Sequence, residues 1–315
     1  MATTISGYNL KEVLATHLSD YLENSHLDEQ MKNIIIKLLH NKGKILNNKE
    51  TFVWSEFYLL YSLVFLNSNE LEEQLSIAAA IELLILATDI MDEISDNEIN
   101  GENLSKLGIP KGLTIANALL IEAFAILLKS KCHLNLAFDE LRKASIGQWR
   151  DISFVVSEIN IPTEQEYFNI INMKSSSLVR LLFRLSNCDI KDTNLVKVAT
   201  NIGLAGQLKN DAQDIFTPDK NDLFQLKATL PLIKALEYST QFENGSLMRK
   251  LISLKETQSI EMHTNIQTYI KRVGSIDYTL VLSRMYMNSA ITSIKKYENS
   301  YNRNNIEFLI NYLIR

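Results

Sequence analysis

The segment LSIAAAIELLILATDIMDEI, residues 75–94, decides the fold that this sequence predicts. It is apolar on nearly every side and then presents Asp89 and Asp92 near its C-terminal end. A helix that is hydrophobic all round is buried, either in the core of a large protein or in a membrane. Glu82 interrupts the apolar run, which is shorter than the roughly 20 residues that cross a bilayer. We therefore expect this segment to be a central helix of a large helical core.

The segment LVKVATNIGLAGQLKNDAQDIF, residues 195–216, repeats this arrangement. Asp211 and Asp214 stand three residues apart near its end, as Asp89 and Asp92 do in the first segment. Negative charge at a helix C-terminus opposes the helix dipole unless a cation offsets it. Two facing helices with inward carboxylates suit Mg²⁺, which prefers oxygen ligands and commonly shares them with phosphate groups. Chance pairs on solvated helix ends are the alternative, but their repetition on two such apolar helices favours a cation site.

Glycine and proline are scarce, at 10 and 4 of 315 residues, so the chain has few tight turns. A strand-rich sandwich or barrel needs many turns, and no short apolar strands alternate with helices as an α/β fold requires. The sequence therefore predicts an all-α fold, a single large helical bundle over residues 1–315 with no linker. The expected helices lie near residues 8–22, 27–40, 53–66, 70–95, 112–130, 134–158, 163–186, 192–216, 229–241, 246–258, 261–272, 275–298 and 304–314.

The charge and cysteine content exclude several classes of function. Lys and Arg number 32 against 37 Asp and Glu, a net charge of −5, which disfavours non-specific nucleic-acid binding and predicts no nucleic-acid partner. Cys132 and Cys188 show no metal or redox spacing and are expected to be reduced. The first residues, 1–20, show no basic start followed by an apolar run, so we expect a cytoplasmic protein.

Around its acidic helix ends, the sequence resembles the isoprenyl diphosphate synthase superfamily. ILATDIMDE (85–93) resembles the first aspartate-rich motif of that family, and GQLKNDAQDIF (206–216) resembles the second. The resemblance covers about residues 70–240 and implies a helical bundle around a central apolar channel. The other matches keep the family's order and are ANALL (116–120), GQWRDI (147–152), MKSSSLVRLLF (173–183), KNDL (220–223) and KATLPL (227–232).

The resemblance implies a site that binds an allylic prenyl diphosphate through Mg²⁺. It implies that the metal ligands are Asp89, Asp92, Asp211 and Asp214, which together with Lys174 are the expected catalytic residues. The expected diphosphate-binding or acceptor-orienting residues are Lys174, Gln207, Lys220 and Lys227. Each lysine has the alternative of being an ordinary surface lysine. Two readings, site residue or simple helix end, stay open for Glu93, Asp96, Gln148 and Asp151.

Departures from the family pattern narrow the expected activity. The family opens each motif with two adjacent aspartates, but here the first position of each pair holds Thr88 or Asn210. The family's arginines after the first motif are absent from residues 92–108, and its N-terminal Gly-Lys-Arg segment survives at best as Gly43-Lys44. A second diphosphate requires such a Lys or Arg fork. The combination resembles the ComQ-type tryptophan prenyltransferases, which modify the ComX pheromone precursor.

Three functions follow from this resemblance. The first is a Mg²⁺-dependent prenyltransferase that moves a farnesyl or geranyl group to a tryptophan of a small precursor peptide in quorum sensing. The second is a chain-elongating polyprenyl diphosphate synthase that uses isopentenyl diphosphate, which the missing arginines argue against. The third is a non-catalytic regulatory subunit of such a synthase. The resemblance also allows a homodimer and, because the donor is a lipid, a peripheral membrane contact.

Overall fold

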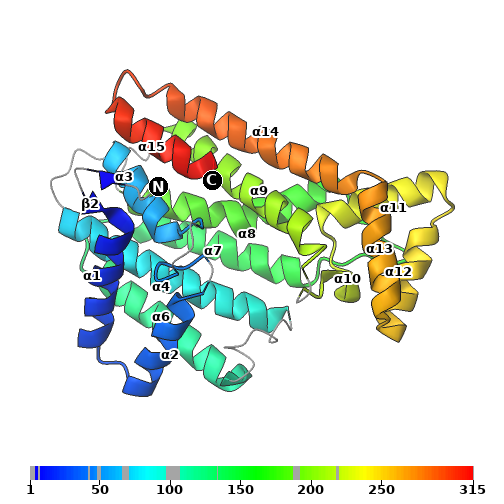
Figure 1. The fold of residues 1–315 in the computed structure, drawn as a ribbon, viewed down its shortest axis with the longest axis horizontal. Helices are drawn as coiled ribbons and strands as arrows, with labels where there is room; N and C mark the ends of the chain where they lie inside the picture. Colours follow the sequence, from blue (N-terminus) through cyan, green and yellow to red (C-terminus); the bar gives the residue numbers. More distant parts are fainter. Residues whose placement is uncertain are drawn as a thin grey trace.

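The computed structural model describes residues 4–5, 8–41, 43–47, 51–65, 71–96, 107–132, 134–186, 192–217 and 220–314. These residues form an all-α fold, which confirms the predicted fold class (Figure 1). A short antiparallel pair, β1 (Thr4–Ile5) and β2 (Tyr8–Asn9), precedes the helices. The helices are α1 (Leu10–Asn24), α2 (Glu29–Leu39), α3 (Trp54–Phe65), α4 (Leu71–Ser95), α6 (Ile109–Leu127), α7 (Leu134–Ile152), α8 (Glu164–Leu185), α9 (Thr193–Asp214), α10 (Asp222–Gln225), α11 (Leu230–Phe242), α12 (Ser246–Thr257), α13 (Ile260–Arg272), α14 (Ser275–Lys295) and α15 (Arg303–Ile314).

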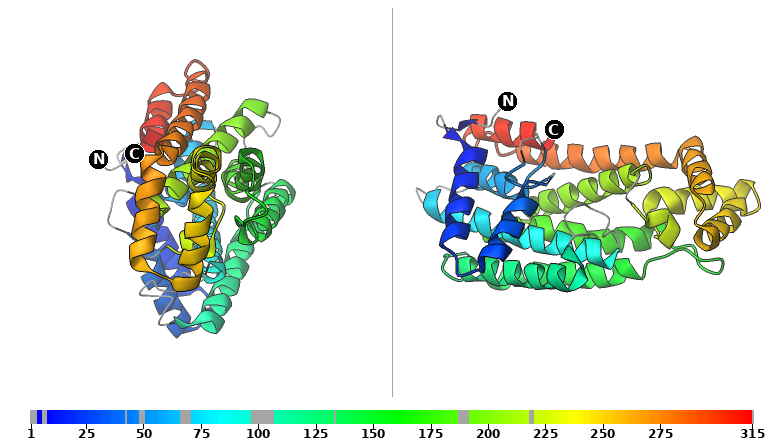
Figure 2. Two further views of the ribbon diagram at one scale, coloured as in Figure 1. Left: turned by 90° about the vertical axis from the view of Figure 1, so that its right-hand side faces the viewer. Right: turned by 60° about the horizontal axis from the view of Figure 1, so that its bottom comes forward.

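The long helices α4, α6, α7, α8, α9 and α14 run along the long axis of the molecule (Figure 1). Helix α4 packs against α6 and α3, α8 packs between α7 and α9, and α9 packs against α14. The first helices cross one end of this bundle, while α11, α12 and α13 gather at the other end (Figures 1 and 2). The C-terminal ends of α4 and α9 therefore both lie away from the end that α1 and α2 cover.

Helix α4 is the core helix that its sequence predicts. Every residue from Ile77 to Ala87 is buried, including Glu82. By length and composition, both α4 and α6 could cross a membrane, but 78% of the most apolar α4 window is buried within the protein, against 33% of that of α6. Burial inside the bundle thus accounts for the apolar character of α4. The described apolar core falls into two clusters, so one domain over residues 1–315 stays a prediction.

The predicted helices match the observed ones closely, with two informative differences. The helix expected over 134–158 ends at Ile152, because the chain then extends and Val156 donates its N–H to the carbonyl oxygen of Leu226 at 2.8 Å. The four-residue helix α10 was not expected, since so short a segment shows no helical periodicity. The start of α8 follows its sequence signal, a capping box in which Thr163 and Glu166 satisfy each other's N–H groups.

Two glycines set the distances between α7, α8 and α9. A Cβ atom placed on Gly147 would lie 2.3 Å from the backbone nitrogen of Lys174. A Cβ atom on Gly203 would lie 2.4 Å from the Cα atom of Ser176. Both distances are well below van der Waals contact, so only glycine permits these crossings. Helices α7 and α9 thus fix the position of the α8 backbone around Lys174.

A buried arginine holds the same three helices together. The Arg180 guanidinium of α8 donates to Glu140 Oε2 of α7 at 2.8 Å and to Thr200 Oγ1 of α9 at 3.2 Å. It also donates to the side-chain and backbone oxygens of Asn172, at 2.9 and 3.1 Å. Because a buried charge is costly unless it is paired and hydrogen-bonded, this network ties α7, α8 and α9 into one arrangement.

Candidate active site

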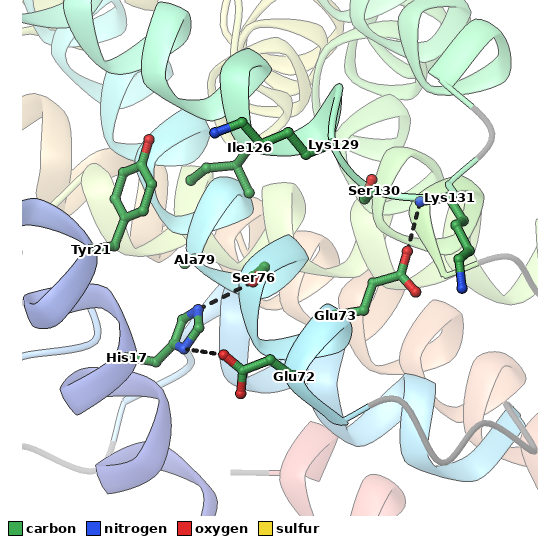
Figure 3. Close-up of a pocket in the computed structure, with 10 residues that line it drawn as sticks. All are labelled: His17, Tyr21, Glu72, Glu73, Ser76, Ala79, Ile126, Lys129, Ser130 and Lys131. Atoms are coloured by element: carbon green, nitrogen blue, oxygen red, sulfur yellow. Dashed lines mark hydrogen bonds and ion pairs between the residues drawn. The ribbon is translucent and has the colours of Figure 1, made fainter. Parts of the chain in front are cut away.

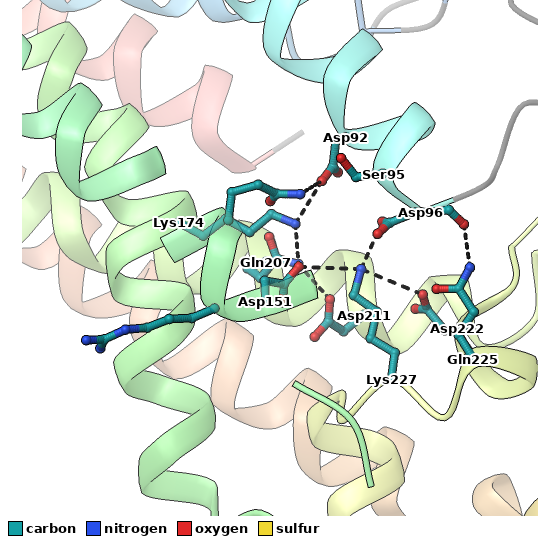
Figure 4. Close-up of polar contacts among 12 residues, drawn as sticks. Asp92, Ser95, Asp96, Asp151, Lys174, Gln207, Asp211, Asp222, Gln225 and Lys227 are labelled. Carbon is teal, nitrogen blue, oxygen red and sulfur yellow. Dashed lines mark hydrogen bonds and ion pairs between the residues drawn. The ribbon is translucent and has the colours of Figure 1, made fainter. Parts of the chain in front are cut away.

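A cluster of charged side chains lies where the ends of α4 and α7 meet the middle of α8 and the segment around α10 (Figure 4). Lys174 Nζ lies 3.1 Å from Asp92 Oδ1 and 2.7 Å from Asp151 Oδ2. Lys227 Nζ lies 2.9 Å from Asp96 Oδ2 and 3.5 Å from Asp151 Oδ2. We call this set the acidic cluster; its members are Asp92, Asp96, Asp151, Lys174, Asp222 and Lys227.

The acidic cluster holds four carboxylates against two ammonium groups, a formal charge of −2. Burial alone raises the pKa of Asp92, but the charges of Lys174 and Lys227 and a 2.6 Å hydrogen bond from Gln148 Nε2 hold that pKa below its usual value. Burial alone lowers the pKa of Lys227, but Asp151, Asp222 and Asp96 outweigh burial and raise it. Asp92 and Lys227 are therefore charged at neutral pH, and negative charge is in excess.

The second aspartate-rich motif lies beside this cluster, at the end of α9. Asp211 is buried, and its two carboxylate oxygens accept hydrogen bonds of 2.7 Å from Tyr167 Oη and Gln207 Nε2. Burial raises the pKa of Asp211 to about 6. Asp214, one turn further, is partly exposed, and its Oδ2 lies 4.0 Å from Lys220 Nζ. Asp214 is thus more open to solvent than Asp211, whose oxygens are engaged inside the protein.

Asp89 takes a partner outside the acidic cluster, although it stands only three residues before Asp92. Its carboxylate pairs with Lys44, which comes from the segment between α2 and α3. Asp96, four residues after Asp92, joins Asp92 in the acidic cluster and pairs there with Lys227. Since residues three and four apart both share a helix face, the spacing alone could not decide between Asp89 and Asp96 as the neighbour of Asp92.

The structure thus gathers part of the predicted site and adds residues to it. Lys174, Lys227, Gln207, Asp92 and Asp211 lie together (Figure 4). Asp89 pairs with Lys44 instead, and Asp214 lies beside Lys220. Among the added residues, Asp151 connects the two lysines, and Gln148 binds Asp92. The sequence signal for both was the GQWRDI match, in which Gln148 and Asp151 stand three apart on α7. Asp222 lies within the KNDL match (220–223), from which only Lys220 was predicted as a site residue.

The acidic cluster suits a hard divalent cation. All its candidate ligands are carboxylate oxygens, which Mg²⁺ and Ca²⁺ prefer, and its excess negative charge favours a cation. In the part of the chain that the structure describes, no three His, Cys, Asp or Glu side chains form a group that could hold a metal by themselves. Mg²⁺ usually takes one or two carboxylates from a protein and completes its shell with water and phosphate oxygens.

A separate pocket lies at the opposite end of α4 (Figure 3). Its volume is about 520 Å³, and its lining residues are His17, Tyr21, Glu72, Glu73, Ser76, Ala79, Ile126, Lys129, Ser130 and Lys131. The pocket lies between α1, the first turns of α4 and the end of α6, at the other end of α4 from Asp92. The predicted central channel stays a prediction.

We expect Asp211 to make the stability of the metal-free protein depend on pH. Its folded-state pKa of about 6 exceeds the usual value of 3.8, so the folded state favours the protonated form. As the pH rises from about 4 to about 6, this group should therefore lower the free energy of unfolding by about 3 kcal/mol. Asp211→Asn should remove that fall and raise stability at pH 7, as measured by urea unfolding in the presence of a chelator. Equal pH profiles for both proteins would contradict this prediction.

Comparisons with known proteins agree with this fold. Residues 28–270 match the polyprenyl synthetase family. The chain is 25% identical over 289 residues to the tryptophan prenyltransferase ComQ of Bacillus subtilis subsp. natto, covering 87% of this chain and 88% of that protein. It is 27% identical to a geranylgeranyl pyrophosphate synthase of Dictyostelium discoideum over 66% of this chain and 72% of that protein.

The fold comparison leads to the same family. A polyprenyl synthase from Caulobacter crescentus, solved with calcium and isoprenyl diphosphate, superposes with a TM-score of 0.78 and 19% identity, covering 96% of this chain and 92% of that one. At this level of identity the likeness shows the all-α isoprenoid synthase fold. Because the family match spans most of the chain, this protein belongs to the polyprenyl synthetase family and is a prenyltransferase.

Proposed function

We propose that this enzyme is a Mg²⁺-dependent prenyltransferase that moves a farnesyl or geranyl group from an allylic diphosphate to a tryptophan of a small precursor peptide. The acidic cluster carries the donor half of this proposal, because it pairs excess carboxylates with two lysines at one place. The acceptor half is supported by the similarity to a tryptophan prenyltransferase along most of both chains. A role in the maturation of a quorum-sensing pheromone, in the cytoplasm, belongs to the same proposal.

Asp92 of α4, Asp96 just after α4 and Asp214 of α9 would hold Mg²⁺ ions in this reaction, with one or two of these carboxylates on each ion. When bound, Mg²⁺ supplies Lewis-acid chemistry that neutralises the charge developing on the leaving diphosphate. Lys174 and Lys227 lie among these carboxylates and can donate to diphosphate oxygens. Removing one such charged donor commonly costs roughly 2.7–4 kcal/mol of transition-state stabilisation. Lys220, 4.0 Å from Asp214, would reach the diphosphate from the other side.

Asp211 and Asp89 take other roles in this proposal than the sequence suggested. Both oxygens of Asp211 accept hydrogen bonds inside the protein, so Asp211 would fix Gln207 and Tyr167 behind the metal site. Gln207 also accepts a hydrogen bond from Ser175, next to Lys174, and so connects the second motif to α8. Asp89 pairs with Lys44 and would bind no metal in this arrangement.

The chemical step would break the bond between the first prenyl carbon and the diphosphate oxygen. A carbon of the indole ring would form the new bond to that prenyl carbon, and the ring would then lose a proton to solvent. The allylic cation must be kept from water, which an apolar pocket does. Phe168 lies next to Tyr167, with ring centroids 5.6 Å apart, and offers an aromatic face near Asp211 for this purpose.

Chain elongation with isopentenyl diphosphate is the second candidate, and the similarity to geranylgeranyl pyrophosphate synthases favours it.

A homodimer and a peripheral membrane contact also belong to the proposal. The surface on which either contact should be sought comprises the exposed apolar residues of α6 and α7. These residues are Ile109, Leu113, Ile121, Ile146, Trp149 and Ile152.

We expect the purified enzyme, given Mg²⁺, farnesyl or geranyl diphosphate and a tryptophan-containing precursor peptide, to yield a peptide heavier by one prenyl group. Mass spectrometry of the peptide measures this product, and a peptide with phenylalanine in place of tryptophan is the control. Conversion of isotope-labelled isopentenyl diphosphate to a longer prenyl diphosphate, with no modified peptide, would support the second candidate instead.

A further inference from the structure

The residue before Lys227 has a backbone conformation that is unusual for its type. Leu226 has φ 59° and ψ 32°, which lies in the left-handed region. Steric contact with the Cβ atom makes this region unfavourable for residues other than glycine, and asparagine and aspartate tolerate it best among the rest. The other non-glycine residues with positive φ in the described part of the chain are Asn244 and Gln258, which are polar and exposed. A buried leucine in this conformation therefore needs a physical explanation.

Burial and backbone hydrogen bonds hold Leu226 in the left-handed conformation. Its side chain is 6% exposed and belongs to the second of the two apolar core clusters. Its carbonyl oxygen accepts a 2.8 Å hydrogen bond from the N–H group of Val156. Ala228 donates its own N–H group to the carbonyl oxygen of Phe154 at 2.9 Å. The residues on both sides of Lys227 are thus bonded to the extended segment that follows α7.

The left-handed turn at Leu226 also sets the direction in which Lys227 points. The N–H group of Lys227 donates to the carbonyl oxygen of Asp222 at 2.9 Å, which closes the turn at the end of α10. The ammonium group of Lys227 then lies 2.9 Å from Asp96 Oδ2 and 3.5 Å from Asp151 Oδ2 (Figure 4). A change of φ at Leu226 from 59° to roughly −60° would turn the following chain by about 120° relative to α10. The position of Lys227 therefore depends on the conformation of Leu226.

We propose that Leu226 is a positioning residue for the prenyl donor, because its left-handed backbone places the Lys227 ammonium group where the diphosphate binds. Sparsely populated backbone conformations persist where the surrounding structure enforces them, and they gather at functional sites. The inference rests on the proposed function, which assigns Lys227 to the diphosphate. Leu226 acts only through Lys227, and its buried side chain offsets the cost of its own backbone conformation.

The test compares Leu226→Val with Leu226→Gly by the binding of labelled farnesyl diphosphate with Mg²⁺, measured by equilibrium dialysis. Leu226→Val keeps most of the apolar side chain, but a β-branched residue fits the left-handed region poorly. Leu226→Gly loses the side chain but adopts that region freely. We expect Leu226→Val to bind about tenfold or more weakly than the wild type, the loss typical of a hydrogen bond to a charged group. Leu226→Gly should bind within about threefold of the wild type per folded molecule.

A role in core packing alone predicts the opposite order, because valine retains more of the buried side chain than glycine. The double variant Leu226→Val/Lys227→Gln tests the connection to Lys227, since it should bind no more weakly than Lys227→Gln alone. Leu223→Val is the matched control and should bind as the wild type does. Leu223 is 2% exposed in the same core cluster and lies within α10, before the left-handed turn.

Three results would overturn the inference. They are binding by Leu226→Val equal to that of the wild type, weaker binding by Leu226→Gly than by Leu226→Val, and a full further loss in the double variant. If circular dichroism shows that Leu226→Val does not fold, Leu226→Ala replaces it, because alanine also disfavours positive φ. Leu226→Ala should then bind more weakly than Leu226→Gly, and equal or tighter binding would overturn the inference.

The binding assay uses the prenyl donor alone and is independent of the acceptor. Failure of the wild type to bind farnesyl diphosphate would contradict the proposed function and this inference together. Donor binding by the wild type with equal binding by all the Leu226 variants would contradict this inference alone. The two proposals can therefore be judged separately.

Discussion

Asp92→Asn should lower kcat/KM for prenyl transfer by about 10²–10³-fold, the loss typical of removing one charged group that stabilises a transition state. Asp92 lies where Lys174 and Gln148 meet the end of α4, and 40% of its side chain is exposed, so its carboxylate is open to a cation. The amide of asparagine keeps the size of the side chain and can still bond to a lysine. It removes the negative charge that would attract a divalent cation.

The measurement is steady-state kinetics at several Mg²⁺ concentrations, with the peptide product quantified. We expect Asp92→Asn to need more Mg²⁺ for half-maximal rate as well as to be slower. Asp139→Asn on α7 is the matched control, because Asp139 is half-exposed and pairs only with Arg142 among the described contacts of its carboxylate. Activity of Asp92→Asn within a few-fold of the control would show that Asp92 is no metal ligand.

Gly203→Ala should destabilise the protein by more than about 3 kcal/mol, at or beyond the upper range for overpacked cores. The new methyl group would lie 2.4 Å from the Cα atom of Ser176, and that atom belongs to the backbone of α8 and cannot rotate away. Helices α8 and α9 would have to separate, which would also displace Lys174 and Gln207 from each other.

Gly206, three residues further along α9, provides the control. A Cβ atom there would have no neighbour within 4 Å, so Gly206→Ala should be neutral or stabilise the helix by up to about 1 kcal/mol. Free energies of unfolding from urea titration measure both changes. Equal stability of the two alanine variants would show that the crossing of α8 and α9 relaxes at little cost.

The sequence predicted the helices well because each depends on local features that can be read along the chain. Scarce glycine and proline, apolar periodicity and the capping box at Thr163 mark where helices run and where one begins. The buried α4 followed from the absence of a polar face. The end of α7 at Ile152 was missed, because Val156 pairs with Leu226, a residue 70 positions away.

The site was predicted in outline because the motifs place acidic residues at the ends of two core helices. The choice among those acids was beyond the sequence, since Asp89 and Asp96 are equally good neighbours of Asp92 by helical spacing. Only packing shows that Lys44 faces Asp89 and that Lys227 faces Asp96.

The amino-acid sequence was therefore enough to predict the longer helices, the central place of α4 and the acidic residues near its end. The tertiary structure alone decided which carboxylate pairs with which lysine, and that Asp151 connects Lys174 to Lys227. The two kinds of interaction differ in how far apart in the sequence the interacting residues stand. Helix formation depends on neighbours within about four residues, whereas an ion pair depends on the distance between side chains far apart in the chain, which helix packing sets.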